Sequence, residues 1–143
     1  MQRMKTRVHL AACGLLGTAV VLLSGCSGIA TETLDDIILH SAVVAQPGDE
    51  AIILGTVALT PQRCVGIEDA DGVIRAVVWP DETQLVESDP VRMTVGVPDD
   101  LMIGDEVAGA GGYYESSDDL ASVAQKCGAP DEVIRIRFEP FSG

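Results

Sequence analysis

Aromatic and basic side chains are scarce in this chain. Its 143 residues include one tryptophan, two tyrosines and two phenylalanines, and nine lysines and arginines stand against 22 aspartates and glutamates. Sites for sugars or single-stranded nucleic acid stack their ligands on aromatic rings, so this composition disfavours them. The formal net charge of −13 also repels the phosphates of nucleic acids and of anionic lipids. We therefore expect no nucleic-acid partner, and the acidity favours a basic protein, a cation or solubility alone.

The chain also lacks an apolar stretch long enough to cross a bilayer. The longest one, residues 10–23, has about 14 residues, whereas a membrane-spanning helix needs roughly 20. Basic residues precede this stretch, and small residues and a cysteine follow it. A basic N-terminal region, a short apolar segment and small residues at its C-terminal end predict a cleaved export signal rather than a membrane-spanning helix.

The predicted export signal ends with Leu23, Ser24 and Gly25, followed by Cys26. This order resembles the lipobox of bacterial lipoproteins, in which a small residue stands directly before an invariant cysteine. The resemblance implies that a diacylglyceryl group is attached to the Cys26 thiol, that residues 1–25 are removed as a signal peptide, and that the new amino group is acylated. It places the protein on the extracytoplasmic face of the cell membrane, or on the outer membrane of a cell that has one. An uncleaved anchor helix, or an ordinary signal peptide with a chance cysteine, is the alternative.

Cleavage before Cys26 would leave a small, strongly acidic protein. It would keep 118 of the 143 residues and six of the nine basic ones, so its formal charge would be six minus 22, or −16. A chain of this length suits one domain with a single core. Residues 26–48 are predicted to form a lipidated tether and residues 49–143 a single small β-barrel domain. The apolar part of the tether, residues 34–44, would form a short helix or an irregular strand that docks on the domain.

The four cysteines have different predicted fates. Cys13 leaves with the signal, and Cys26 is the lipidation site. Cys64 and Cys127 remain as an even pair in an oxidising compartment, so we predict a disulfide between them. Two free thiols are the alternative, and the wide spacing does not match a redox-active Cys-x-x-Cys motif.

Short β-branched stretches, separated by glycine and proline, dominate the rest of the chain. We predict a polar loop over residues 80–90 and one helix from Ser116 or Ser117, its N-cap, to about Gln125. The pattern predicts an all-β domain with one short helix: a small antiparallel OB-like β-barrel, with a small β-sandwich as the alternative. The predicted strands cover residues 52–59, 64–67, 73–79, 91–95, 101–107 and 132–138.

Two motifs match parts of known ligand sites but fit turns and strand crossings better. Asp69, Asp71 and Gly72 match the start of an EF-hand loop, but Pro80 stands where that loop needs its glutamate. A hairpin turn is therefore favoured. Residues 109–112 (Gly-Ala-Gly-Gly) lack the lysine and hydroxyl residue of a P-loop, so we interpret them as a close crossing of strands.

Histidine is too scarce for the common catalytic and zinc sites. His40 is the only histidine after residue 25, and it lies in the predicted tether, outside the barrel. A Ser-His-Asp triad or a zinc centre is therefore not expected, and we predict no catalytic residue, no metal and no cofactor. An enzyme that uses carboxylates alone is one alternative.

Three features of the mature part occur together: Val-Trp-Pro at residues 78–80, Gly-Asp-Glu-Val at residues 104–107, and a pair of cysteines. They resemble small uncharacterised lipoproteins of actinobacterial type, over residues 51–138. The resemblance implies no known activity. In such a barrel we expect Trp79 to fill one end.

The combined observations predict a lipid-anchored binding or interaction module of the cell envelope, with an unknown ligand and no catalysis. The anchor, the acidic composition and the missing catalytic residues are its basis. The first alternative is an inhibitor of a basic secreted hydrolase, such as a lysozyme-like enzyme, which the negative charge would attract. The expected partners are the membrane, through the lipid anchor, and a protein of the envelope.

Overall fold

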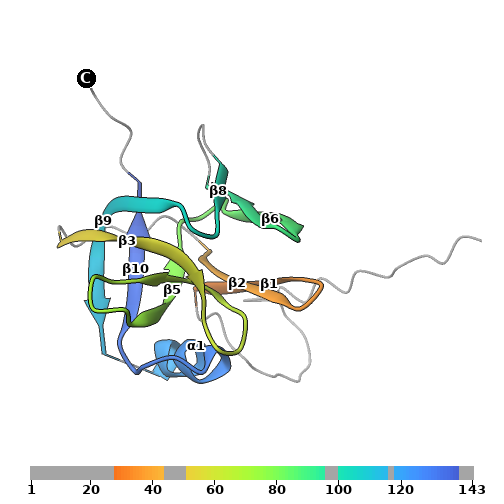
Figure 1. Ribbon diagram of the computed structural model, residues 1–143. Helices are drawn as coiled ribbons and strands as arrows, with labels where there is room; N and C mark the ends of the chain where they lie inside the picture. The colour runs from red at the N-terminus through yellow and green to blue at the C-terminus, as the bar shows by residue number, and fades with distance from the viewer. Residues whose placement is uncertain (1–27, 44–50, 96–99, 116–117, 139–143) are drawn as a thin grey trace, which may run out of the picture.

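The computed structural model describes residues 28–43, 51–95, 100–115 and 118–138 (Figure 1). These residues form ten β-strands and one α-helix. In chain order they are β1 (Ile29–Leu34), β2 (Ile37–Ala42), β3 (Ala51–Leu59), β4 (Val65–Glu68), β5 (Ile74–Trp79), β6 (Gln84–Ser88), β7 (Val91–Thr94), β8 (Asp100–Met102), β9 (Glu106–Tyr114), α1 (Asp118–Cys127) and β10 (Val133–Arg137).

Five of these strands close into a barrel. β3 pairs with β4 and β9, β5 pairs with β4 and β10, and β9 pairs with β10, so the ring runs β3, β4, β5, β10, β9 and back to β3. The predicted all-β, OB-like barrel is therefore confirmed. One pairing differs from the antiparallel prediction, because β5 and β10 run parallel. Strand directions cannot alternate all the way round a ring of five, so one pair has to be parallel.

The barrel interior holds one of the two hydrophobic clusters. On β3, Ile53 points into it and is fully buried, whereas Ile52 and Leu54 on either side point outward. This is the two-residue period of a β-strand. Trp79, at the end of β5, is also fully buried in this cluster, and its indole N–H donates to the carbonyl of Val65 at 2.9 Å.

Two glycines let neighbouring barrel strands approach closely. A Cβ atom added at Gly111 in β9 would lie 1.9 Å from the carbonyl oxygen of Arg135 in β10, and one at Gly55 in β3 would lie 2.5 Å from the carbonyl oxygen of Glu68 in β4. Neither distance is possible between real atoms, so only glycine fits these positions without movement of the backbone. The prediction that residues 109–112 mark a close crossing of strands is confirmed.

Helix α1 covers the outer face of the barrel at β5 and β10. Leu120 of the helix shares a second hydrophobic cluster with Ala76 and Val78 of β5, and all three are buried. The predicted helix is confirmed in type and position. Its predicted cap at Ser116 or Ser117 lies outside the described residues.

The β1–β2 hairpin belongs to the domain, so the prediction of a tether over residues 26–48 is wrong for residues 29–42. The strand predicted to dock within residues 34–44 is present as β2. β2 runs parallel to β5 and extends the sheet beyond the barrel. Ile37 and Leu39 have no exposed surface and belong to the barrel core. These two residues point to the same side of β2, because successive side chains of a strand alternate in direction. The domain therefore begins before residue 49.

A small sheet of β6, β7 and β8 packs on the barrel, at the side opposite to α1 in Figure 1. Leu85 and Met93 from this sheet belong to the interior cluster. The prediction of a loop over residues 80–90 is wrong, because β6 lies within it. Leu85 is the only buried residue of β6, and the pairing with β7 shifts register after Leu85. The segment therefore shows no regular apolar alternation in the sequence.

The other predicted strands agree with the structure, with one exception. Five of the six are present within one residue of their predicted bounds. The predicted strand over residues 101–107 is instead divided between two sheets: β8 ends at Met102, and β9 begins at Glu106. Gly104 in the turn between them has a φ of +97°, a conformation that interrupts a strand.

Candidate functional site

The lipobox residues Leu23, Ser24 and Gly25 and the lipidation site Cys26 lie outside the described residues. The lipid anchor therefore stays a prediction from the sequence. Within the part of the chain that the structure describes, no helix combines the length and the apolar character that crossing a membrane requires.

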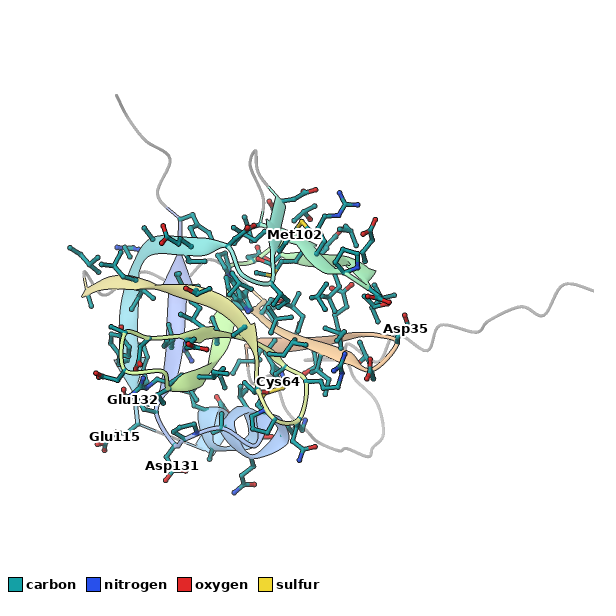
Figure 2. All side chains as sticks on the ribbon, viewed as in Figure 1. Asp35, Cys64, Met102, Glu115, Asp131 and Glu132 are labelled. Carbon is teal, nitrogen blue, oxygen red and sulfur yellow. A yellow bond between two sulfur atoms is a disulfide. The ribbon has the colours of Figure 1, made fainter. Side chains whose placement is uncertain are left out.

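Cys64 and Cys127 form the predicted disulfide, with their Cα atoms 5.4 Å apart. Cys64 stands directly before β4, and Cys127 is the last residue of α1. Figure 2 shows Cys64 between the barrel and the helix. The two cysteines are 63 positions apart, and closing a loop of this length stabilises the fold by about 4 kcal/mol on the chain-entropy relation. The bond therefore holds α1 against the barrel.

His40 is buried beside the barrel, so the prediction that it lies in a tether is wrong, although β2, which carries it, stands outside the five-strand ring. The β1–β2 hairpin carries it inward, and only 2% of its surface is exposed. Its Nδ1 is 3.1 Å from the hydroxyl of Thr31 on β1, and its Nε2 is 3.9 Å from Sγ of Cys64. Burial, together with the positive charge of Lys126, lowers the pKa of His40 to about 4. The ring is neutral at pH 7 and out of reach of a substrate, so it suits a structural role better than that of a general base.

The ring also belongs to a group of three side chains with metal-binding atoms. Among the described residues, the ligand atoms of His40, Cys64 and Cys127 lie within 4.8 Å of one another. Zinc or copper would bind the two cysteines as thiolates. Both sulfur atoms are joined in the disulfide, so the oxidised protein offers only the imidazole. We assign no metal to this cluster.

The turn between β4 and β5 is a hairpin turn, as predicted. One carboxylate oxygen of Asp69 accepts hydrogen bonds from the N–H groups of Asp71 at 2.9 Å and Val73 at 3.0 Å, and the other oxygen pairs with Arg75. The hydrogen bond from Val73, followed by those from Arg75 and Asp71, lowers the pKa of the Asp69 carboxyl. Gly72 adopts a φ of +80°, which glycine tolerates without strain. The Asp69 oxygens therefore stabilise the turn instead of forming a calcium loop.

One face that OB-folds commonly use for ligands is covered in this protein. In such barrels the second and third strands bind oligonucleotides or oligosaccharides, and the equivalent strands here are β4 and β5. Ala76 and Val78, on the outer face of β5, are buried in the cluster that includes Leu120 of α1 and Ala42 of β2. A ligand of the barrel would have to use another surface.

The outer face of β3 provides such a surface. Ile52 and Leu54 are 73% and 60% exposed, more than any other large hydrophobic side chain among the described residues. They are two positions apart on one strand and therefore point to the same side. Their register partners on β9 are Ala110 and Ala108, whose methyl groups cover little of them. Exposed apolar surface with a polar rim is typical of interaction sites.

A groove of about 570 Å³ lies beside Leu54; we call it the β3–β9 groove. Glu68 at the end of β4 and Glu106 at the start of β9 are both register partners of Thr56 on β3. Two carboxylates therefore flank Thr56, one on each side. Within the described part of the chain, neither of them takes part in an ion pair. The groove is lined by Leu54, Gly55, Thr56, Glu68, Asp69, Ala70, Glu106, Val107 and Ala108.

This arrangement suits a partner that is both apolar and positively charged. Burial of aliphatic surface stabilises a complex by about 25 cal/mol for each Å² removed from water, before the costs of association. Glu68 and Glu106 would attract lysine or arginine side chains and orient them. Two carboxylates could also serve acid–base chemistry, but the groove is open, and no histidine or aromatic side chain is among the residues that line it. An open groove with an apolar and an acidic side suits a binding surface.

The sequence contains a signal for this surface that the strand prediction did not use. Ile52, Ile53 and Leu54 are three consecutive apolar residues in one strand. Because successive side chains of a strand alternate in direction, at least one of the three has to point out of the barrel. The acidic side chains of the groove give no comparable signal. Glu106 reaches Thr56, and with it Glu68, only through the pairing of β3 with β9, two strands that are distant in the sequence.

Comparison with known proteins adds no relative from which a function could be transferred. No protein-family model, no curated protein and no solved structure matches this chain at a significant level. The groove, the charge and the predicted anchor are therefore the basis for its function.

Proposed function

We propose that this chain is a lipid-anchored protein of the cell envelope that binds a protein partner through the β3–β9 groove. The observation that carries the proposal is the exposed pair Ile52 and Leu54 beside an acidic groove. The lipobox that ends at Cys26 supports export and anchoring. A buried disulfide is consistent with export, because such bonds persist in oxidising compartments.

The partner in this proposal is a basic protein. The chain has 22 acidic and nine basic residues, and removal of residues 1–25 would leave a charge of −16. Long-range attraction speeds the approach of a basic partner, and short-range contacts with Glu68 and Glu106 would fix its orientation. The attraction should weaken as salt is added, because the Debye length falls to about 8 Å at physiological ionic strength.

The same features favour a second candidate function, inhibition of a basic secreted hydrolase such as a lysozyme-like enzyme. Ile52 and Leu54 protrude beside two carboxylates, a combination that could enter the cleft of a basic enzyme. An inhibitor lowers the turnover of its target, whereas an interaction module without that role does not. Cell-wall hydrolysis by lysozyme, measured with increasing amounts of this protein at low and at physiological salt, separates the two functions. Inhibition that weakens with salt would favour the inhibitor.

Substitutions on β3 test the binding surface directly. Ile52→Ser and Leu54→Ser remove the aliphatic side chains of the pair without changing the charge, and Val86→Ser is a matched control, because Val86 is 40% exposed on β6 of the small sheet. Loss of one aliphatic contact worth about 1.4 kcal/mol would weaken binding about tenfold.

The measurement is crosslinking in intact envelopes, followed by purification of this protein in detergent and identification of the attached partner by mass spectrometry. We expect a basic partner with the wild type and with Val86→Ser, and its loss with either β3 variant. Equal recovery of the partner by all four proteins would show that the groove is not the binding surface.

A further inference from the structure

The first strand begins very close to the predicted lipidation site. β1 starts at Ile29, and the carbonyl of Gly28 accepts a hydrogen bond from the N–H of Val43 at 2.8 Å, which fixes Gly28 to the domain. Only Ser27 stands between Gly28 and Cys26. Because consecutive Cα atoms are about 3.8 Å apart, the Cα atoms of Cys26 and Gly28 are separated by at most roughly 7.6 Å.

We infer that the folded domain rests directly on the bilayer, with the surface around Gly28 and Val43 against the lipid headgroups. This inference depends on the lipid anchor of the proposed function. The glyceryl group on Cys26 would lie at the boundary between headgroups and acyl chains, and the headgroup layer on each side of a bilayer is roughly 5–8 Å thick. The chain from Cys26 to Gly28 is no longer than this layer, so it leaves no room for a spacer between membrane and domain.

The surface near the anchor has a composition that suits this contact. Val43 is 52% exposed, and an aliphatic side chain is favoured at the boundary of the acyl region. Ile29 and Ala42 pack in the cluster that contains α1, so the helix lies next to the contact surface. The other tip of the hairpin, where Figure 2 labels Asp35, is roughly 20 Å from Ile29 along β1 at the rise of a β-strand.

The position of the anchor also determines which face of the barrel stays free. The hairpin joins the barrel at β5 through β2. β3 and β9 are the two strands of the ring that do not pair with β5, so they lie across the barrel from the anchored strand. The β3–β9 groove would therefore face away from the hairpin that carries the lipid, at a fixed height above the membrane.

Fluorescence quenching in vesicles tests this orientation. The full lipidated protein, with its acylation confirmed by mass spectrometry, is reconstituted into phosphatidylcholine vesicles with and without a lipid that carries a nitroxide on its headgroup. Val43→Trp reports on the proposed contact surface and Leu54→Trp on the groove, and both positions are exposed enough to accept the ring. Trp79 is fully buried and gives the same background in both variants. We expect the nitroxide to quench the emission of Val43→Trp and to leave that of Leu54→Trp nearly unchanged.

A spacer variant serves as the control for the short linker. Insertion of about ten glycine and serine residues between Ser27 and Gly28 adds a mean reach of roughly 17 Å, so the emission of Val43→Trp should recover. Equal quenching of the two tryptophan variants, or quenching of Val43→Trp that the spacer leaves unchanged, would overturn the inference while the lipid anchor stands. If the acylated protein does not float with the vesicles, the lipid anchor itself is wrong, and the inference fails with it.

Discussion

Acidification from pH 7 to pH 5 should destabilise this protein through a single buried ring. His40 is 2% exposed, and burial lowers its pKa from 6.5 to about 4 in the folded state. The unfolded chain would bind a proton at this ring with the ordinary pKa, so it takes up the proton at a higher pH than the folded chain does. The contribution of the neutral ring to stability is complete above pH 6.5 and is lost as the pH falls towards 4.

The size of the effect follows from the two pKa values. One pH unit inside this window corresponds to about 1.36 kcal/mol. With a pKa of 6.5 unfolded and about 4 folded, the free energy of unfolding should fall by about 2 kcal/mol between pH 7 and pH 5. This is a large part of the roughly 5–15 kcal/mol that stabilises a typical domain. Ordinary carboxylates titrate near 4, so most of them stay charged over this range.

Urea unfolding at pH 7 and at pH 5, on the wild type and on His40→Asn, measures the effect. The asparagine cannot titrate, and its amide keeps a polar group near the hydroxyl of Thr31. We expect the wild type to lose about 2 kcal/mol more than the variant over this range. Equal losses would refute the reasoning, because the ring would then have the same pKa in the folded and unfolded chains.

Three further predictions concern stability. Replacement of both disulfide cysteines by serine should lower the free energy of unfolding by about 4 kcal/mol, measured in urea with the reduced wild type for comparison. Gly111→Ala should destabilise the barrel by about 1–3 kcal/mol, because the added carbon would overlap the backbone of β10; a thermal midpoint equal to that of the wild type would contradict this close approach. A chain that starts at residue 49 loses Ile37 and Leu39 from the core, about 3–6 kcal/mol of burial. It should lack a cooperative unfolding transition, whereas a chain that starts at residue 28 should retain one.

Local signals in the sequence were sufficient for most of the barrel. Gly72 and the prolines mark where strands end, and these turns depend on residues next to each other in the chain. The disulfide could be predicted because Cys64 and Cys127 are the only cysteines left over after the signal and the lipidation site. Helix α1 could be predicted from the serine residues at its start, which favour an N-cap. In each case the information lies within a short stretch or in a simple count.

Features that depend on distant pairings could not be predicted in this way. Residues 37–39 are three consecutive apolar residues, which indicate a docked segment, but the sequence does not say whether it is a helix or a strand or which strand receives it. His40 was misplaced for the same reason, because its burial depends on the hairpin. β6 has a single buried residue and an irregular register, so its sequence resembles a loop. The β3–β9 groove exists only because strands far apart in the chain become neighbours.

Helix α1 and the β1–β2 hairpin, which lie outside the five-strand ring, determine which faces of the barrel a ligand can reach. An OB-like barrel that binds nucleic acid needs its second and third strands open and favours basic side chains around them. Here α1 and β2 bury the outer face of β5, and the disulfide holds the helix in place. The predicted anchor precedes the β1–β2 hairpin, which pairs with this same strand through β2, so the closed face and the membrane attachment lie on one side of the barrel. The most exposed aliphatic side chains, Ile52 and Leu54, lie on a strand of the ring that does not pair with β5. A short anchor on the side of β5 would turn Ile52, Leu54 and the acidic β3–β9 groove away from the membrane. A basic protein that approaches from outside could then reach them, as the proposed binding function requires.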